Sequence, residues 1–259
     1  MAIITFMSDF GQRDHYVAAV KAKIFSIDPA INVVDITHHI EHFNIAHAAF
    51  VLKSVFKDFP KGTVHLVSVN SPSLDKDRMV AVKLEDHYFV GVDNGLFSLL
   101  SDNNQLPVIV VELNKDSNSS IFPEKTVLAE AAVSLASGVA IYNLGKQLLQ
   151  IKQMLNRQLR ITKHQISGHV IHVDNYGNLI TNISLEVFDK AKEDRKYTFS
   201  FAREIIDTLS TSYDSTDNGD CIVLFNSNGF LEIAICQGNA SELLGLSYDS
   251  PVNIFFVAE

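Results

Sequence analysis

The first polar loop of the chain carries residues that suit the binding of a sugar. It reads Ser8-Asp9-Phe10-Gly11-Gln12-Arg13-Asp14 and lies between a predicted strand and a predicted helix. Open α/β proteins bind ligands at the carboxyl ends of their strands, where such a loop lies. Because a carboxylate accepts paired hydrogen bonds, Asp9 is well placed for ribose hydroxyls. The alternative is structural, with Asp9 and Asp14 capping the turn and the helix.

Four histidines crowd the segment after the second predicted strand: His38, His39, His42 and His47. The i,i+4 spacing of His38 and His42 would suit a metal ion on a helix. The four residues follow a strand instead, and no cysteine or carboxylate cluster completes a set of ligands. We therefore expect solvated or hydrogen-bonded loop histidines and no metal site.

Further polar loops follow buried strands in both halves of the chain, at residues 70–78, 93–95, 174–182, 226–232 and 237–240. Their many uncharged amides suit adenine and amino-acid recognition as well as they suit turns. The motifs of dinucleotide-binding proteins, P-loop enzymes, serine hydrolases and zinc peptidases are absent. The residues alone therefore predict a small polar ligand between two domains.

The elements that position the first loops form an α/β pattern. Up to about residue 138, β-branched runs alternate with helical periods, which predicts a mostly parallel sheet flanked by helices. Asp14 and Asn44 stand where helix N-caps belong, and Pro60 stands where the second helix should stop. The predicted strands are 3–7, 32–36, 64–69, 80–84, 88–92 and 108–113, and a third helix is predicted at 126–138.

After about residue 144 helical spacing is scarce and short strands dominate. Strands are predicted at 170–173, 179–183, 197–201, 222–225, 231–235 and 252–257. Turn signals between them favour a small all-β barrel or sandwich. We therefore predict an α/β domain at 1–145, a basic connector at 146–165 and a β-barrel-like domain at 166–259.

Composition narrows the function further. The 259 residues carry 21 Lys and Arg against 30 Asp and Glu, a formal net charge of −9. This is the wrong sign for neutralising nucleic-acid phosphates or an anionic membrane. Two cysteines, no basic leader and no apolar run near the roughly 20 residues of a membrane span predict a cytoplasmic protein.

In their order and spacing, these segments resemble one family along essentially the whole chain: the S-adenosyl-L-methionine (SAM) hydroxide adenosyltransferases, relatives of fluorinase and chlorinase. The matching stretches are SDFG (8–11), DHYV (14–17), VDITH (34–38), AAFVL (48–52), FPKGTVHL (59–66), VGVDNG (90–95), GNLITNI (177–183) and NSNGFLEIA (226–234). The resemblance implies a homotrimer that holds SAM between the α/β domain of one subunit and the β domain of the next, with no cofactor.

The resemblance also implies roles for binding residues. Asp9 would bind the ribose hydroxyls and Phe43 would lie against the sugar. Asp14 and Asp174 would meet the methionine ammonium, which is electrostatically sensible in a closed site. The other predicted binding residues are Asn178 on adenine, Phe225 as a stacking partner, Asn239 in a loop that gives backbone contacts, and Ser73 and Phe122 in matching loops.

In the hydrolytic members of that family an Asp, an Arg and a His orient and deprotonate the water that attacks ribose C5′. This chain departs at all three places, with Asn70 for the Asp, Asp77 for the Arg and Pro123 for the His, although Arg78 keeps an adjacent Arg. An amide orients water but does not take its proton. The catalytic apparatus is therefore missing or rebuilt.

Three functions remain open. The favoured one is a SAM hydrolase in which Glu124 or Asp77 replaces the lost base, with Arg78 and Asn70 nearby. The alternative is a SAM- or adenosine-binding trimer without hydrolysis, acting as a sensor or a structural protein. A halogenase is disfavoured, because Glu124 would put negative charge beside an anionic nucleophile.

Overall fold

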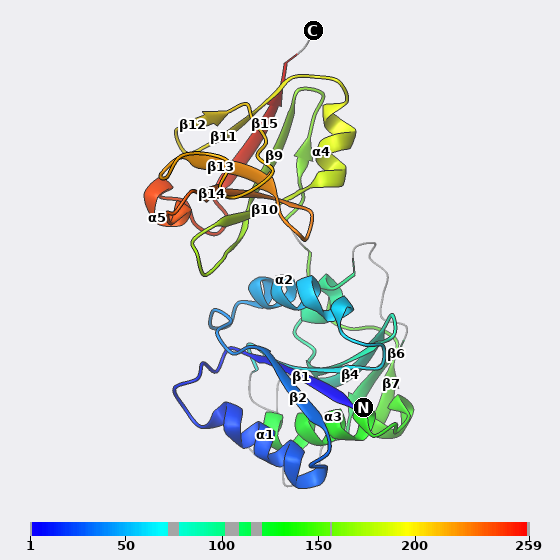
Figure 1. Ribbon diagram of the computed structural model, residues 1–259. Coiled ribbons are helices and arrows are strands. Elements are labelled where there is room, and N and C mark those ends of the chain that lie inside the picture. The colour runs from blue at the N-terminus through cyan, green and yellow to red at the C-terminus, as the bar shows by residue number, and fades with distance from the viewer. Residues whose placement is uncertain (1, 72–77, 102–108, 115–120, 156, 258–259) are drawn as a thin grey trace. The chain divides into compact units, whose positions relative to one another are not determined.

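The computed structural model describes residues 2–71, 78–101, 109–114, 121–155 and 157–257. The chain divides into two compact units, 1–156 and 157–259, and each is described by itself (Figure 1). Within the described ranges, no helix combines the length and apolar character that a membrane crossing requires.

The first unit is a seven-stranded sheet in the order β2-β1-β3-β5-β4-β6-β7. The neighbours β2, β1, β3 and β5 run parallel, while β4, β6 and β7 add antiparallel pairings. The α/β fold class is confirmed. Its main elements are β1 (Ile3–Ser8), α1 (Tyr16–Ile27), β2 (Asn32–Thr37), α2 (Ile45–Val55), β3 (Val64–Ser68), β4 (Met79–Leu84), β5 (His87–Val92), β6 (Ile109–Leu113), α3 (Ala129–Ala136) and β7 (Gly145–Leu148).

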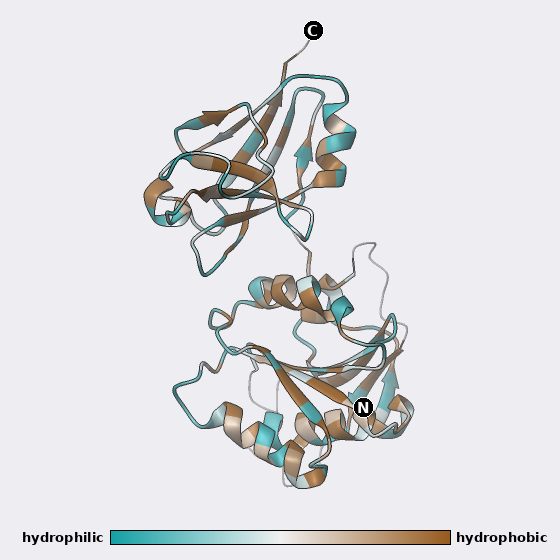
Figure 2. Ribbon diagram, in the orientation of Figure 1, coloured by the Kyte–Doolittle hydropathy of each residue, from teal (hydrophilic) through white to brown (hydrophobic). Residues whose placement is uncertain are grey.

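Helices cover both faces of this sheet. Figure 1 shows α1 and α3 on one face and α2 on the other. Alternate residues of each strand therefore enter two cores: Phe6 and Leu66 pack with α1 and α3, whereas Met7 and Val67 pack with α2. A strand that is buried on both faces has a continuous run of apolar residues. Figure 2 shows such hydrophobic runs in the central strands.

The start of α1 differs from the prediction. The helix begins at Tyr16, and the preceding His15 has helical backbone angles with no side-chain cap. The expectation that Asp14 caps this helix is therefore wrong. Asp14 is exposed on the loop before the helix, one position too early to reach the first free N–H groups.

The limits of α2 follow the predicted signals more closely. Asn44 is the N-cap, and its Oδ1 accepts a hydrogen bond from His47 N at 2.9 Å. The α-helix ends at Val55, and one 3₁₀ turn at 56–58 follows. The regular helix therefore stops before Pro60, through a tightened last turn.

The second unit is an antiparallel sheet in the order β12-β11-β15-β9-β10-β14-β13, with β8 paired to β9, and it is barrel-like. The six predicted strands are all present, and several are longer than predicted. Its elements are β8 (Arg160–Ile161), β9 (Gln165–Val173), β10 (Leu179–Ser184), α4 (Leu185–Lys192), β11 (Tyr197–Phe201), β12 (Glu204–Ile206), β13 (Cys221–Phe225), β14 (Phe230–Ile235), α5 (Ala240–Leu244) and β15 (Pro251–Phe256).

A buried histidine pair lies in the core between the first sheet and α2. His65 Nδ1 is 2.7 Å from Thr5 Oγ1, and His65 Nε2 is 3.2 Å from His87 Nδ1. The His65 ring stacks on Phe89 at a centroid distance of 4.9 Å. Burial, and then the neighbouring His87, lower the pKa of His65 from 6.5 to about 3. His65 is therefore neutral in the folded protein near neutral pH.

We expect the free energy of unfolding to fall as the pH drops below 6.5. The stability that comes from neutral His65 is complete above 6.5, the ordinary histidine pKa, and is lost as the pH falls toward about 3. Within that pH range, unfolding takes up one proton at His65. The free energy of unfolding therefore changes by about 1.4 kcal/mol per pH unit. Urea unfolding across this range measures the slope. His65→Leu should destabilise the protein and reduce the slope by about one proton; an unchanged slope in that variant would contradict the assignment.

Candidate functional site

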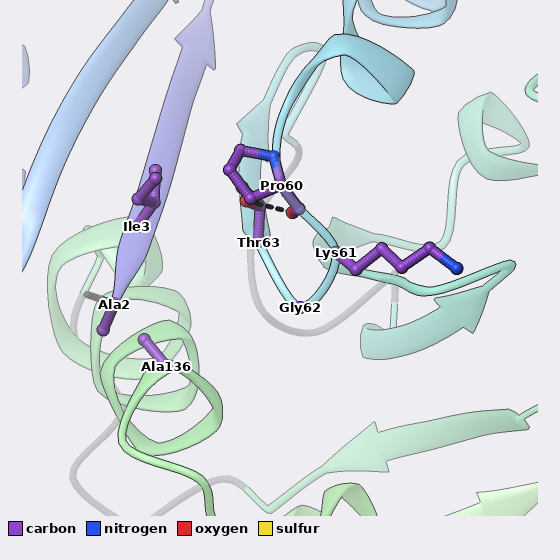
Figure 3. A pocket seen from close by; sticks show the side chains of 7 residues that line it. All are labelled: Ala2, Ile3, Pro60, Lys61, Gly62, Thr63 and Ala136. Carbon is purple, nitrogen blue, oxygen red and sulfur yellow. Dashed lines mark hydrogen bonds between the residues drawn. The ribbon is translucent and has the colours of Figure 1, made fainter.

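The two ends of the first sheet differ in chemistry. At the amino-terminal ends of β1 and β3 a cavity of about 260 Å³ lies between the start of β1, the turn at 60–63 and Ala136 (Figure 3). Lys61, beside this cavity, pairs with Asp86 at 2.7 Å. No predicted site residue lines it. The predicted site residues of this unit that the structure describes gather at the carboxyl ends of the parallel strands, where α/β sheets bind ligands.

Asp9 directly follows β1, and the polar contacts at the carboxyl ends of the strands converge on its side chain. Its carboxylate is buried, 8% exposed, and Oδ2 accepts hydrogen bonds from Phe43 N at 3.0 Å and Asn70 N at 3.1 Å. Its own backbone N–H donates to Ser68 O at 3.2 Å. No donor of the described residues reaches Oδ1. Asp9 therefore keeps an oxygen that can accept from a polyol such as ribose.

The two residues that donate to Asp9 have unusual backbones. Phe43 has φ 64° and Asn70 has φ 49°, in the left-handed region that side chains disfavour. Such strain costs on the order of 1–3 kcal/mol and persists where the surroundings hold it. The side chain of Phe43 is 71% exposed, so burial of the ring does not hold it. The Asp9 carboxylate therefore organises both loops around itself.

Glu124 lies next to the same strand ends. Its side chain is 4% exposed, and Oε1 accepts a hydrogen bond from Ser68 Oγ at 2.9 Å. Ser68 Oγ is also 3.3 Å from Ser71 Oγ. Glu124 opens a π-helical turn (Glu124–Leu128) that runs into α3, a distortion that is frequent at functional sites. A buried carboxylate thus lies two hydrogen bonds from Asp9, through Ser68.

Three aromatic rings connect the Asp9 loop to the segment before Glu124. The ring of Phe10 lies 5.7 Å from Tyr16 and 6.0 Å from Phe122, and Tyr16 lies 5.7 Å from Phe122, all between centroids. The cluster brings Phe122 beside the loop that carries Asp9. Exposed Asp14 lies on the same loop.

The loop after β3 is described only in part. Ser73 and Asp77 lie outside the described residues, so their predicted roles stay predictions. Arg78 is described, and its Nη2 donates to Asp93 Oδ2 at 2.6 Å. Asp93 Oδ1 accepts from Lys152 N at 2.8 Å. The Arg78 guanidinium thus binds a buried structural carboxylate.

In the second unit, Asp174 and Asn178 form one compact turn. Asp174 Oδ1 accepts from Tyr176 N at 2.9 Å and Asn178 N at 2.8 Å, and Oδ2 accepts from Asn178 Nδ2 at 3.0 Å. Asn178 is buried. The turn fixes the amide of Asn178 through the carboxylate of Asp174, two predicted binding residues.

Asn239 lies against the same turn. Its Oδ1 caps α5 by accepting from Glu242 N at 3.0 Å, and Ser241 N donates to Gly177 O at 2.9 Å. A Cβ atom added at Gly177 would lie 2.0 Å from Asn239 Oδ1. Gly177 also has φ 84°. The close approach of Asn239 to the turn therefore requires glycine at 177.

We expect Gly177→Ala to destabilise this unit by roughly 2–4 kcal/mol, because it adds left-handed strain and displaces the cap of α5. Gly219→Ala is the matched control: its φ is 93°, and an added Cβ meets open space. The control should cost only about 1–2 kcal/mol of backbone strain. Denaturant unfolding compares the two variants, and equal losses would show that the contact with Asn239 contributes nothing.

A polar cluster joins Asn226 and Glu232, from the polar loop marked in the sequence, to Tyr213, which the sequence did not single out. The Glu232 carboxylate is buried and accepts from Tyr213 Oη at 2.8 Å and Asn226 Nδ2 at 3.0 Å. Burial, the Glu232 hydrogen bond and the charges of Glu232 and Asp174 raise the pKa of the Tyr213 phenol. Tyr213 thus belongs to the cluster through its bond to Glu232, although no motif marks it.

Phe225 ends β13, and its half-buried ring lies 5.3 Å from Phe188 in the barrel core. One side of the ring is therefore packed. The structure thus brings Asp174, Asn178 and Asn239 together, and it gives Phe225 a packing role alongside the predicted stacking role, which stays a prediction.

His38, His39 and His42 lie in the loop after β2, as expected, whereas His47 lies in the first turn of α2. His38 Nδ1 lies 2.7 Å from Ser8 Oγ, and His47 Nδ1 accepts from Glu41 N at 3.2 Å, while His39 and His42 are exposed. Within the described part of the chain, no three His, Cys, Asp or Glu side chains form a group suited to a metal ion.

Comparison with known proteins gives two family matches. Residues 4–145 match the SAM hydroxide adenosyltransferase N-terminal domain, and residues 168–253 match the SAM hydroxide adenosyltransferase C-terminal domain. Together they cover most of the two sheets described above.

Individual relatives in this family are similar to the chain over nearly its whole length. The (R)-S-adenosyl-L-methionine hydrolase of Methanocaldococcus jannaschii is 31% identical over 98% of this chain and 96% of its own. That of Thermus thermophilus is 28% identical over 98% and 100%. The fluorinase of an Actinoplanes species is 24% identical over 90% of each chain.

A solved structure shares the arrangement: an uncharacterized conserved protein from Thermotoga maritima, 30% identical, superposes with a TM-score of 0.89 over 97% of this chain and 99% of its own. With both domain families matched and a relative 31% identical along nearly the whole length, the chain belongs to the SAM hydroxide adenosyltransferase family.

Proposed function

We propose that the protein binds SAM and hydrolyses it to adenosine and L-methionine. The family and the hydrolases among its relatives support this activity. The observation that carries it is the buried Glu124 carboxylate, which is linked to Asp9 through Ser68, because it supplies a base where the family triad is absent.

In this proposal the binding residues fix the two ends of the substrate. Asp9 accepts from the ribose hydroxyls through Oδ1, and Phe43 lies against the sugar. Asp14 and Asp174 attract the methionine ammonium, Asn178 bonds adenine and Phe225 stacks on it. The exposed ring of Phe43 and the rigid turn that holds Asn178 support these roles.

The chemical step is an in-line substitution at ribose C5′. The water oxygen forms a bond to C5′, the C5′–S bond breaks, and its electron pair stays on sulfur, so methionine leaves as a neutral thioether. Glu124 accepts the proton that the water loses. The leaving group needs no proton, so the protein mainly orients the nucleophile and removes its water shell.

Asn70 is proposed to orient the water, since an amide both donates and accepts. Its backbone N–H on Asp9 keeps it next to the sugar site. Asp77 stays an alternative base. Arg78 has an indirect role in this proposal: it binds Asp93 and so fixes the loop at the end of β5.

A binding protein without hydrolysis is the second candidate, because the family Asp, Arg and His are replaced by Asn70, Asp77 and Pro123. A halogenase is disfavoured, because a negative Glu124 repels a halide in a dry pocket.

We also propose a cytoplasmic homotrimer with the ligand between the first domain of one subunit and the second domain of the next, and no nucleic-acid partner. The division of the candidate binding residues between the two domains supports a site that needs both. Light scattering should give three times the mass of the chain.

Incubation of the purified protein with SAM, followed by chromatography, tests the activity. The expected products are adenosine and methionine in equal amounts. Calorimetric binding without products would support the second candidate, and neither binding nor products would reject both.

A further inference from the structure

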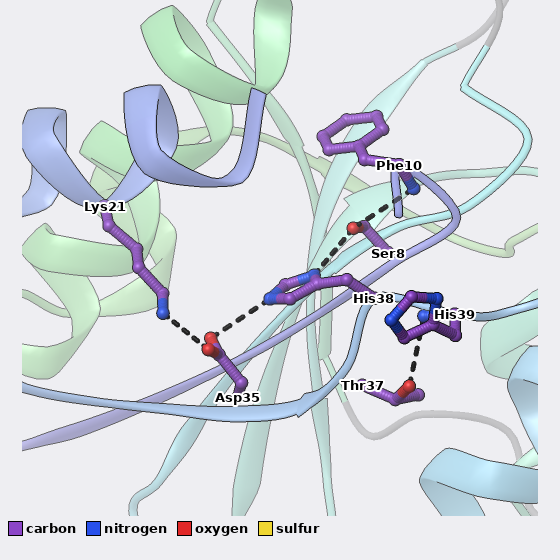
Figure 4. Close-up of polar contacts among 7 residues, drawn as sticks. All are labelled: Ser8, Phe10, Lys21, Asp35, Thr37, His38 and His39. Carbon is purple, nitrogen blue, oxygen red and sulfur yellow. Dashed lines mark hydrogen bonds and ion pairs between the residues drawn. The ribbon is translucent and has the colours of Figure 1, made fainter. Parts of the chain in front are cut away.

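Four polar side chains form a row behind the Asp9 loop (Figure 4). Ser8 Oγ lies 2.7 Å from His38 Nδ1, His38 Nε2 lies 3.1 Å from Asp35 Oδ1, and Asp35 Oδ2 accepts from Lys21 Nζ. Ser8 and His38 are buried, whereas the side chain of Asp35 is 34% exposed. The row therefore runs from the surface at α1 and β2 to the end of β1, one residue before Asp9.

His38 holds the Asp9 loop on both sides. Its ring contacts Ser8, the residue before Asp9, and its carbonyl oxygen accepts from Gly11 N at 2.7 Å, two residues after Asp9. Ser8 Oγ also accepts from Phe10 N at 3.4 Å. A single residue thus anchors the backbone on both sides of the carboxylate.

The Asp35 carboxylate lies 3.1 Å from His38 Nε2, within ion-pair distance, although Nε2 has no partner with hydrogen-bond geometry among the described residues. Burial lowers the pKa of His38 while Asp35 raises it, and the net direction is downward, so the ring is neutral. A neutral imidazole has one donor and one acceptor. The negative charge of the nearby Asp35 carboxylate favours the proton on Nε2, and Nδ1 then accepts from the Ser8 hydroxyl, whose oxygen accepts from Phe10 N.

We propose that His38, with the charge of Asp35 beside it, is a positioning residue that fixes the loop of Asp9 for the ribose of the substrate. The proposal rests on the proposed function. His38 acts through Ser8 and the loop backbone, since its ring lies within the fold against Phe6, at a centroid distance of 4.7 Å.

The same sheet offers a matched control. Thr5, three residues earlier on β1, has its hydroxyl 2.7 Å from His65 Nδ1, and both residues are fully buried. The Thr5–His65 pair thus has the chemistry and burial of the Ser8–His38 pair without its link to Asp9. His65→Leu and His38→Leu remove equivalent contacts, one away from the loop and one beside it.

Calorimetric titration with adenosine, the nucleoside part of SAM, tests the proposal. His38→Leu should raise the Kd for adenosine about 10-fold or more, and His65→Leu should leave it within about twofold, even where both lower the melting temperature. In turnover, His38→Leu should raise KM more than it lowers kcat. His38→Asn, whose Oδ1 replaces the Nδ1 acceptor, should recover most of the affinity.

If His38→Leu does not fold, the Kd for adenosine is measured in His38→Asn and Asp35→Ala instead. Asp35→Ala, at a partly exposed position, should weaken adenosine binding more than His38→Asn does. An unchanged Kd in His38→Leu or in Asp35→Ala, or equal losses in His38→Leu and His65→Leu, would overturn the positioning role while the proposed function stands. A wild-type protein that binds neither adenosine nor SAM would overturn both.

Discussion

Glu124→Gln is expected to lower kcat for SAM hydrolysis by roughly 100- to 10,000-fold, the usual contribution of a general base. Glutamine keeps the shape of the side chain and accepts from Ser68, so the Kd for SAM should change little. The reason is chemical: an amide does not take the proton from the attacking water. Single-turnover kinetics, with calorimetry beside them, separate the rate of the step from binding.

Glu130→Gln is the matched control for Glu124→Gln. Glu130 lies in the first turn of α3, where its exposed side chain pairs with Lys23 at 2.7 Å. A surface pair of this kind contributes little to stability, so kcat should stay unchanged. Asp77→Asn examines the other candidate base. If Glu124→Gln turns over at the wild-type rate and Asp77→Asn does not, the base is Asp77 and the role given to Glu124 is wrong.

Asp9→Asn is expected to raise the Kd for SAM and for adenosine about 10- to 100-fold. Each hydrogen bond to a charged acceptor contributes about 1.5–3 kcal/mol, and the amide places a donor where the ribose hydroxyls also donate. The bonds from Phe43 N and Asn70 N require only an oxygen, so the two strained loops should keep their conformation. Calorimetric titration of both ligands measures the loss.

The control for Asp9→Asn is Asp86→Asn in the turn after β4. Asp86 is exposed and pairs with Lys61 beside the cavity at the other end of the sheet. Its replacement should leave both affinities unchanged. Equal affinities in wild type and Asp9→Asn would place the ribose elsewhere.

Strands of the first domain were predictable because burial on both faces leaves runs of β-branched residues, as in β1 and β3. The helices α4 and α5 were not predicted, since eight and five residues are too few to establish a helical period. The π-helical turn at Glu124 also escaped prediction, because the extra residue in such a turn has no compositional signal.

The candidate site was predictable one loop at a time. Asp9 follows a strand, and that position alone marks it, whereas the role of Asp174 came from the family resemblance. The pairing of Glu124 with Ser68 and of His38 with Ser8 was not predictable, since 56 and 30 residues separate the partners. These contacts depend on the order and register of β1, β2 and β3, which local sequence patterns do not specify.

The most direct test of the account is SAM turnover in water labelled with ¹⁸O, with mass spectrometry of both products. Water attack at ribose C5′ predicts that the label appears in the 5′-hydroxyl oxygen of adenosine, and that methionine is released unlabelled in equal amount. Adenosine without the label, or SAM that stays intact while it binds, would contradict hydrolysis at C5′ and leave a binding protein built on the same fold.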